Sequence, residues 1–179
     1  MSYRSIAPRA ASHAVVDRHA DEYTVWGYQN VDMVLWTRAP TVTGIERFHA
    51  LIPRRLSEAG ASRLSVVHVG LASARLPSLD ARSAFTKVAR KWRSAIGALA
   101  VVVEQEGWVG STLRGLAAGI VVLSGQRLTM RIASHVGEAA AWLPEPHLRE
   151  TGVALDPAEL YDVLTEIRAC SALRASASA

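Results

Sequence analysis

The sequence has a single cysteine, Cys170, so an intrachain disulfide is excluded. It also lacks an apolar run of the ~18 residues that a membrane-spanning helix needs. The richest apolar stretch, from Leu116 to Leu123, has only eight residues and includes Gly119. No apolar leader segment follows Met1 either, and we therefore expect a cytoplasmic protein without an integral membrane segment.

Lysine is nearly absent, since 18 of the 20 basic residues are arginine, and the formal net charge is only +4. A nucleic-acid-binding protein gathers its basic residues on one face or among exposed aromatic side chains. Here the arginines are spread along the whole chain, from Arg4 to Arg174. The sequence therefore predicts no nucleic-acid partner.

The composition that remains is typical of a globular protein, with 179 residues of which 50% are hydrophobic and 20% charged. A chain of this length has enough residues to bury a core as one domain. The polar composition of residues 1–20 and the Ala/Ser-rich residues 171–179 favours a disordered head and tail. We therefore expect a single domain over residues 21–170.

The hydrophobic periodicity changes repeatedly between that of strands and that of helices. Tyr23 to Tyr28 and Val31 to Trp36 read as a hairpin that turns at Gln29-Asn30. Strand patterns at 64–69, 98–103 and 128–132 then alternate with helix patterns, one of which contains Pro53 and either kinks or breaks there. This order predicts an α/β fold: a mainly parallel five-stranded sheet with an N-terminal β-hairpin and helices packed against it.

Three local signals mark where the expected helices begin and end. Asp80 is in position to cap the helix that carries Phe85 and Trp92 on its apolar face. Gly60 follows the last apolar residue of an earlier helix, as a C-terminal cap does. Asp156-Pro157 followed by Glu159 is typical of the start of a helix.

The order of these segments resembles that of a bacterial STAS-type domain, in particular the SpoIIAA-like or STAS/SEC14 group. The segments that carry the resemblance are Tyr23 to Trp36, Val66 to Val69, Val101 to Val103, Met130 to Ile132 and Glu138 to Leu143. The resemblance implies a non-enzymatic regulatory module that binds another protein or, in some relatives, a lipid.

Anti-sigma-factor antagonists of that family carry a phosphorylated serine within an Asp-Ser pair at the start of a helix. The corresponding stretch here, Gly70 to Ser83, is longer and lacks the Asp-Ser pair. Ser78 and Ser83 lie nearest to the switch position and are the possible phosphoacceptors that the resemblance implies.

The histidines form no pair at metal-ligand spacing, so we expect neither a metal site nor a cofactor. His68 lies in an apolar strand pattern, where a hydrogen-bonded, partly buried imidazole is the expected role rather than catalysis. His49 follows Glu46 by three residues, which predicts a surface pair on a helix.

The strongest candidate for a binding surface lies where two expected strands end at one edge of the sheet. We predict that Ser78, Asp80, Glu104, Glu106 and Trp108 meet there and dock a partner protein. Tryptophan is enriched among the residues that anchor interfaces, and Trp108 opens a helix beside Gly107, where a side chain is often partly exposed.

Two alternatives from other classes stay open. One is a carrier of a lipid or other apolar ligand, held in a gap that Gly115 and Gly119 leave between a helix and the sheet. The other is a small enzyme of unknown reaction that uses Glu104 and Glu106.

Overall fold

The computed structural model describes residues 13–19, 22–71, 76–123 and 129–177. Its elements follow one another in this order: β1 (His13–His19), β2 (Tyr23–Tyr28), β3 (Val31–Trp36), α1 (Val42–Ala50), α2 (Ile52–Ala59), β4 (Leu64–Gly70), α3 (Leu79–Lys91), β5 (Ile96–Val103), α4 (Gly107–Leu123), β6 (Thr129–Ala133), α5 (Val136–Trp142), α6 (Pro144–Thr151) and α7 (Pro157–Ala177). The α/β class predicted from the sequence is confirmed.

The described strands form one mixed sheet in the order β1-β2-β3-β4-β5-β6. β1, β2 and β3 pair antiparallel, whereas β3, β4, β5 and β6 pair parallel. The prediction of a five-stranded sheet is therefore wrong in its strand number, because β1 adds a sixth strand and a second antiparallel pair. Three of the five pairings between the described strands are parallel.

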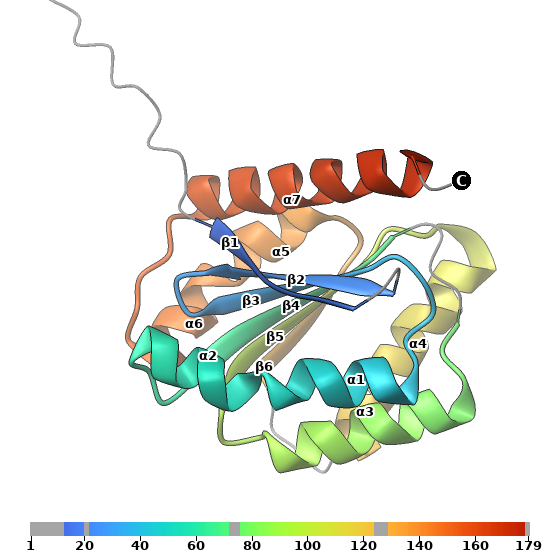
Figure 1. Cartoon of the computed structure of the whole chain (residues 1–179), viewed down its shortest axis with the longest axis horizontal. Helices are drawn as coiled ribbons and strands as arrows, with labels where there is room; N and C mark the ends of the chain where they lie inside the picture. Colours follow the sequence, from blue (N-terminus) through green and yellow to red (C-terminus); the bar gives the residue numbers. More distant parts are fainter. Residues whose placement is uncertain (1–12, 20–21, 72–75, 124–128, 178–179) are drawn as a thin grey trace, which may run out of the picture.

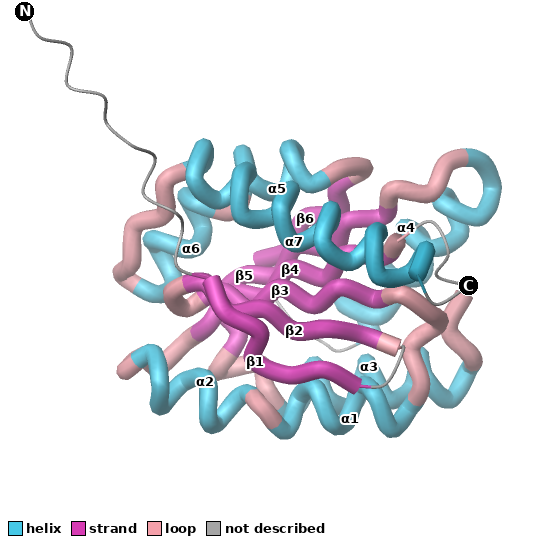
Figure 2. Tube along the Cα trace, turned by 45° about the horizontal axis from the view of Figure 1, so that its top comes forward, coloured by secondary structure: helices cyan, strands magenta, loops and turns pink. Residues whose placement is uncertain are grey.

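Helices cover both faces of this sheet (Figures 1 and 2). The parallel strands follow one another in sequence order, so right-handed crossovers place the connecting helices on one face. α1, α2, α3 and α4 are these connections, and α5, α6 and α7 cover the opposite face. Each face thus has a core of its own.

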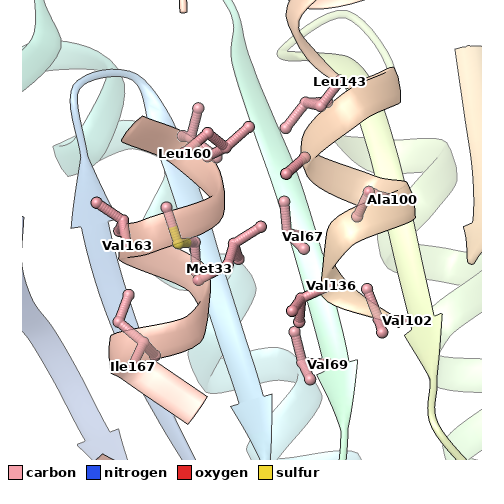
Figure 3. Packing of buried hydrophobic residues seen from close by; sticks show 14 of the residues in the cluster. Met33, Val67, Val69, Ala100, Val102, Val136, Leu143, Leu160, Val163 and Ile167 are labelled. Atoms are coloured by element: carbon pink, nitrogen blue, oxygen red, sulfur yellow. The ribbon is translucent and has the colours of Figure 1, made fainter. Parts of the chain in front are cut away.

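The core beneath α5 and α7 is tightly packed (Figure 3). Leu160, Val163 and Ile167 of α7 lie over Met33 of β3, with Leu160 and Val163 fully buried. On this face of β5 every side chain is small, and Ala98, Ala100 and Val102 are 0% exposed. Small residues on the strand let α5 approach the sheet closely.

The local sequence signals account for several boundaries. The hairpin between β2 and β3 forms as predicted, with Gln29 in the left-handed region at φ 50°. Pro53 separates α1 from α2 and occupies the first turn of α2, where its missing N–H costs nothing. Gly60 ends α2 at φ 57°, and Asp156 Oδ1 accepts the amide of Ala158 at 2.8 Å at the start of α7.

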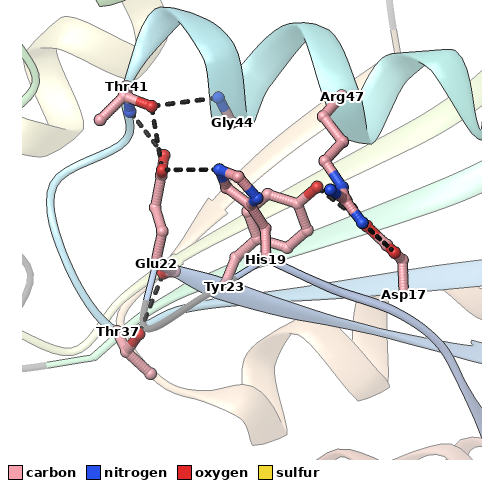
Figure 4. Close-up of polar contacts among 8 residues, drawn as sticks. All are labelled: Asp17, His19, Glu22, Tyr23, Thr37, Thr41, Gly44 and Arg47. Carbon is pink, nitrogen blue, oxygen red and sulfur yellow. Dashed lines mark hydrogen bonds and ion pairs between the residues drawn. The ribbon is translucent and has the colours of Figure 1, made fainter.

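β1 lies in the segment that the sequence predicts as a disordered head, and that prediction is wrong for residues 13–19. The strand pairs with β2 along its length, and its side chains are tied to α1 (Figure 4). Arg47 donates to Asp17 at 3.0 Å, and Tyr23 Oη donates to the same carboxylate at 3.1 Å. Burial raises the pKa of Asp17, but these two hydrogen bonds outweigh it and leave the pKa below its usual value.

Glu22, just before β2, makes a second contact with α1, at the start of that helix (Figure 4). Its carboxylate accepts the backbone amide of Thr41 at 2.6 Å and the Thr41 hydroxyl at 2.9 Å, and Thr41 itself caps α1 through the amide of Gly44. The start of α1 is therefore held by a buried acid from the β1–β2 connection.

One further expectation is corrected at a helix end: α7 continues to Ala177, so the predicted tail from residue 171 is helical over most of its length. Pro144 begins α6 directly after α5, and Ile96 begins β5 a few residues after α3 ends at Lys91.

Candidate functional site

An apolar cavity of about 160 Å³ lies between the sheet and the helices α3 and α4. β5 and β6 supply its floor, and the side chains of the two helices face them. The principal lining residues are Leu99, Val101, Val103 and Met130 from the strands and Phe85, Ala89, Leu113, Leu116 and Ala117 from the helices. The cavity continues to Trp36, His49 and His68 on one side and to Arg93 before the start of β5.

This cavity exists because α4 does not close over the strands beneath it. Leu99 and Val101 lie in a strand with neighbours on both sides, yet each remains partly exposed on the α4 face. The opposite face of the same strand is completely buried. The sequence predicts a gap at this place from Gly115 and Gly119, but the cavity wall is made by Leu113, Leu116 and Ala117.

His68 points from β4 toward the cavity and is held by a tryptophan. Trp36 Nε1 donates to His68 Nδ1 at 3.0 Å, so the one expected hydrogen bond of this imidazole is present. Burial lowers the pKa of His68 to about 4, which leaves the ring neutral at pH 7. Because Nδ1 accepts a hydrogen bond from Trp36, the ring's own proton lies on Nε2.

His49 is the residue that sequence reasoning missed. The predicted surface pair with Glu46 is wrong, because His49 is only 5% exposed whereas Glu46 is exposed. His49 follows Ile45 by four residues, so the two side chains share the buried side of α1. This spacing was visible in the sequence and indicates that His49 is buried. Neither ring nitrogen is hydrogen-bonded within the described part of the chain.

The electrostatics keep His49 neutral as well. Burial, together with the nearby His68 and Lys91, lowers the pKa of His49 to about 3. The Phe48 ring lies 4.8 Å from the His49 ring and 5.5 Å from the His68 ring, measured between centroids, so both imidazoles have aromatic neighbours. The cavity therefore offers two neutral imidazoles in a lining that, apart from Arg93 and Gln105, is mainly apolar.

The sequence-predicted residues on α3 have ordinary structural positions. Ser78 is the N-cap of the helix, and its hydroxyl accepts the amide of Ala81 at 3.2 Å. This corrects the prediction that Asp80 caps the helix, since Asp80 lies exposed in the first turn. Ser83 is exposed one turn further along.

The sequence-predicted residues after β5 do not form one cluster. Glu104 pairs with Arg168 of α7 at 2.7 Å, because alternation along the chain turns it away from the cavity side. Glu106 is exposed, and Trp108 is 74% exposed in the first turn of α4. Glu104 is thereby separated from the predicted docking surface, whereas Trp108 is accessible.

The described ranges contain neither a cluster of metal-binding side chains nor a helix that could span a membrane. No group of three or more His, Cys, Asp or Glu side chains there is arranged to hold a metal ion. Across the same residues, no helix has the length and apolar character required to cross a membrane.

Comparison with known proteins gives no relative from which a role can be transferred. No family model, no curated protein and no solved structure matches this chain. The resemblance to STAS domains therefore stands on the sequence segments alone, and the geometry of the cavity is the main basis for a functional proposal.

Proposed function

We propose that this protein binds a small apolar molecule in the cavity between β5, β6, α3 and α4. The observation that carries the proposal is the cavity itself, with two imidazoles at its side. Protein interiors are packed as densely as organic crystals and leave few voids larger than a water molecule. A buried imidazole such as His49, with no hydrogen-bond partner among the described residues, is also uncommon, since buried polar groups are almost always paired.

The volume of the cavity indicates the size of the ligand. An engineered apolar cavity of about 150 Å³ stays dry and binds benzene. The present cavity, at about 160 Å³, suits one aromatic ring or an aliphatic molecule of similar bulk. Of the apolar ligands considered from the sequence, a compact molecule fits better than a lipid with two acyl chains.

The test compares two neighbouring alanines on α4. Ala117 lines the cavity, whereas Ala118 is exposed on the same helix. Binding of benzene, toluene and indole is measured by NMR titration and by the rise in thermal midpoint that a ligand causes. We expect the native chain and Ala118→Leu to bind at least one of these probes, and Ala117→Leu to lose binding because its side chain fills the space. Equal binding by the two variants, or no binding by the native chain, argues against the proposal.

A second candidate function, docking of a partner protein in a STAS-like regulatory role, is supported by the exposure of Trp108. Leu79 at the start of α3 is also exposed, at 77%. β4 and β5 are parallel neighbours, so the helices that follow them begin at the same edge of the sheet. Large apolar side chains on that edge favour an interface. Trp108→Ala and Leu79→Ser are each titrated against proteins that the native chain retains from its host, and unchanged affinity of both variants counts against docking there.

A further inference from the structure

We infer that the ligand of this cavity carries a neutral hydroxyl group, which accepts a hydrogen bond from His68 and donates one to His49. The class of molecule is a phenol or a similarly compact ring alcohol. This inference rests on the proposed function and adds the polar group that the site recognises. Its basis is that two different imidazoles line the same cavity: His68 offers a hydrogen-bond donor, and His49 has no hydrogen-bond partner among the described residues.

The donor side is set by the contact between two strands. Trp36 of β3 and His68 of β4 lie on neighbouring parallel strands, and the indole N–H occupies Nδ1 of the imidazole at 3.0 Å. A neutral imidazole has one donor and one acceptor, so the remaining nitrogen, Nε2, bears the proton. Phe85 and Phe48 lie edge-on to the ring, at 6.0 Å and 5.5 Å between centroids, and restrict its rotation. His68 thus presents an oriented N–H donor.

The acceptor side is His49, which belongs to α1 and lines the same cavity. One of its two nitrogens carries a lone pair in either neutral tautomer, and neither nitrogen has a partner in the described residues. Leaving such a group buried and unpaired costs free energy, which a bound hydroxyl recovers by donating to it. The hydroxyl oxygen still has lone pairs for His68.

Other polar groups fit this arrangement less well. A carbonyl oxygen accepts from His68 but offers nothing to the lone pair of His49. A carboxylate needs a cationic or multiply donating partner when it is buried, and both imidazoles are neutral in an apolar lining. Arg93 is the cation among the cavity residues, but it is exposed at the end near the start of β5. A carboxylate ligand would therefore be expected at Arg93 and not at the histidines.

The experiment compares benzene, phenol and benzoate as probes in calorimetric or NMR titrations. With the native chain we expect phenol to bind at least about tenfold more tightly than benzene, equivalent to about 1.4 kcal/mol. In His49→Leu the advantage of phenol should fall to about threefold or less while benzene still binds. His49→Gln, which retains a hydrogen-bonding side chain, should recover part of the advantage, and Ala118→Leu is the matched control.

A measurement on the native protein keeps the inference testable if His49→Leu does not fold. Phenol should shift the imidazole ¹⁵N resonances of His49 and His68, whereas benzene should shift neither by a comparable amount. Equal affinities for phenol and benzene, or a phenol advantage that persists in folded His49→Leu, would overturn the inference while leaving the proposed cavity function in place. Tighter binding of benzoate than of phenol would also overturn it and move recognition to Arg93. Absence of binding by all three probes refutes both proposals.

Discussion

Replacing Arg55 by methionine should destabilise the fold strongly, because it removes the guanidinium that is hydrogen-bonded to the buried carboxylate of Asp32. Arg55 Nε donates to Asp32 Oδ1 at 2.7 Å, and Asp32 is 0% exposed. The second oxygen, Oδ2, already has no hydrogen-bond partner in the described chain. The side chain of Arg55 also bonds the backbone oxygen of Gln29 at 3.2 Å, so it joins α2 to the hairpin turn.

The magnitude follows from the loss of one partner of a buried pair. Such a loss costs about 3–5 kcal/mol, because the other charge stays in the interior without compensation. Domains of this kind are stable by only about 5–15 kcal/mol, so Arg55→Met should remove a large part of the total. Replacing both residues, as Asp32→Leu with Arg55→Met, should recover most of the loss since no buried charge remains.

Urea denaturation at pH 7 and at pH 5 measures these effects. Burial raises the pKa of Asp32 even beside Arg55, and without that guanidinium the pKa rises further. Lowering the pH protonates the orphaned carboxyl group, so the deficit of Arg55→Met should shrink at pH 5. Arg54→Met is the matched control, because Arg54 pairs with Glu58 at the surface and should cost less than about 1 kcal/mol. Equal losses for Arg55→Met and Arg54→Met would refute the reasoning.

Three further outcomes follow from the structure. Burial lowers the pKa of His147 to about 4, so between pH 6.5 and pH 4 the unfolded chain binds a proton at this residue that the folded chain does not bind. The free energy of unfolding should therefore fall by up to roughly 3 kcal/mol as the pH is lowered towards 4. In His147→Gln, the part of this pH dependence that comes from residue 147 should be absent. Trp108→Ala should change the free energy of unfolding by less than about 0.5 kcal/mol in a urea titration, since the ring is exposed, and a loss of several kcal/mol would place it in the core. Removing residues 1–20 should lower the thermal midpoint by more than about 5 °C, because β1 and the Asp17–Arg47 pair are lost; an unchanged midpoint would show that β1 adds no stability.

Features set by nearby residues were predictable from the sequence. The hairpin at Gln29-Asn30, the break at Pro53 and the start of α7 at Asp156 each depend on the conformational preferences of one or two residues. The buried strands β4 and β5 are short runs of β-branched and apolar residues, so their positions were also predictable.

Features that depend on distant partners were not predictable in the same way. β1 has the sequence HAVVDRH, which is too polar to read as a strand, and it forms because β2 offers an edge for pairing and Arg47 of α1 binds Asp17. The register shifts between Val15 and Asp17, which further obscures any alternating pattern. α6 was not recognised as a helix because its first three residues include Pro144 and Pro146. Pro144 occupies the first turn of the helix, where proline is tolerated.

The position of the cavity follows from the same topology that makes the fold. Sequential parallel strands with right-handed crossovers require one face of the sheet to be covered by α1, α2, α3 and α4 in turn. α1 and α2 fill the space over the neighbouring strands with the large side chains of Ile45, Phe48 and Ile52, whereas the buried residues of α3 are Ala81 and Ala84. α4, the last of these helices, is tied to the end of β5 by Arg114, whose guanidinium lies 3.4 Å from the backbone oxygens of Val103 and Gln105.

Beyond that attachment α4 presents Leu116 and Ala117 to the sheet, and these do not reach Leu99 and Val101 closely enough to bury them. A helix chosen only for stability would carry larger side chains there, because filling an apolar void adds burial at little cost. Two neutral histidines lie beside that void: Trp36 sets the tautomer of His68, and His49 has no hydrogen-bond partner in the described part of the chain. They add a polar requirement that core packing does not explain. The combination favours a site kept open for a ligand over an imperfectly packed core.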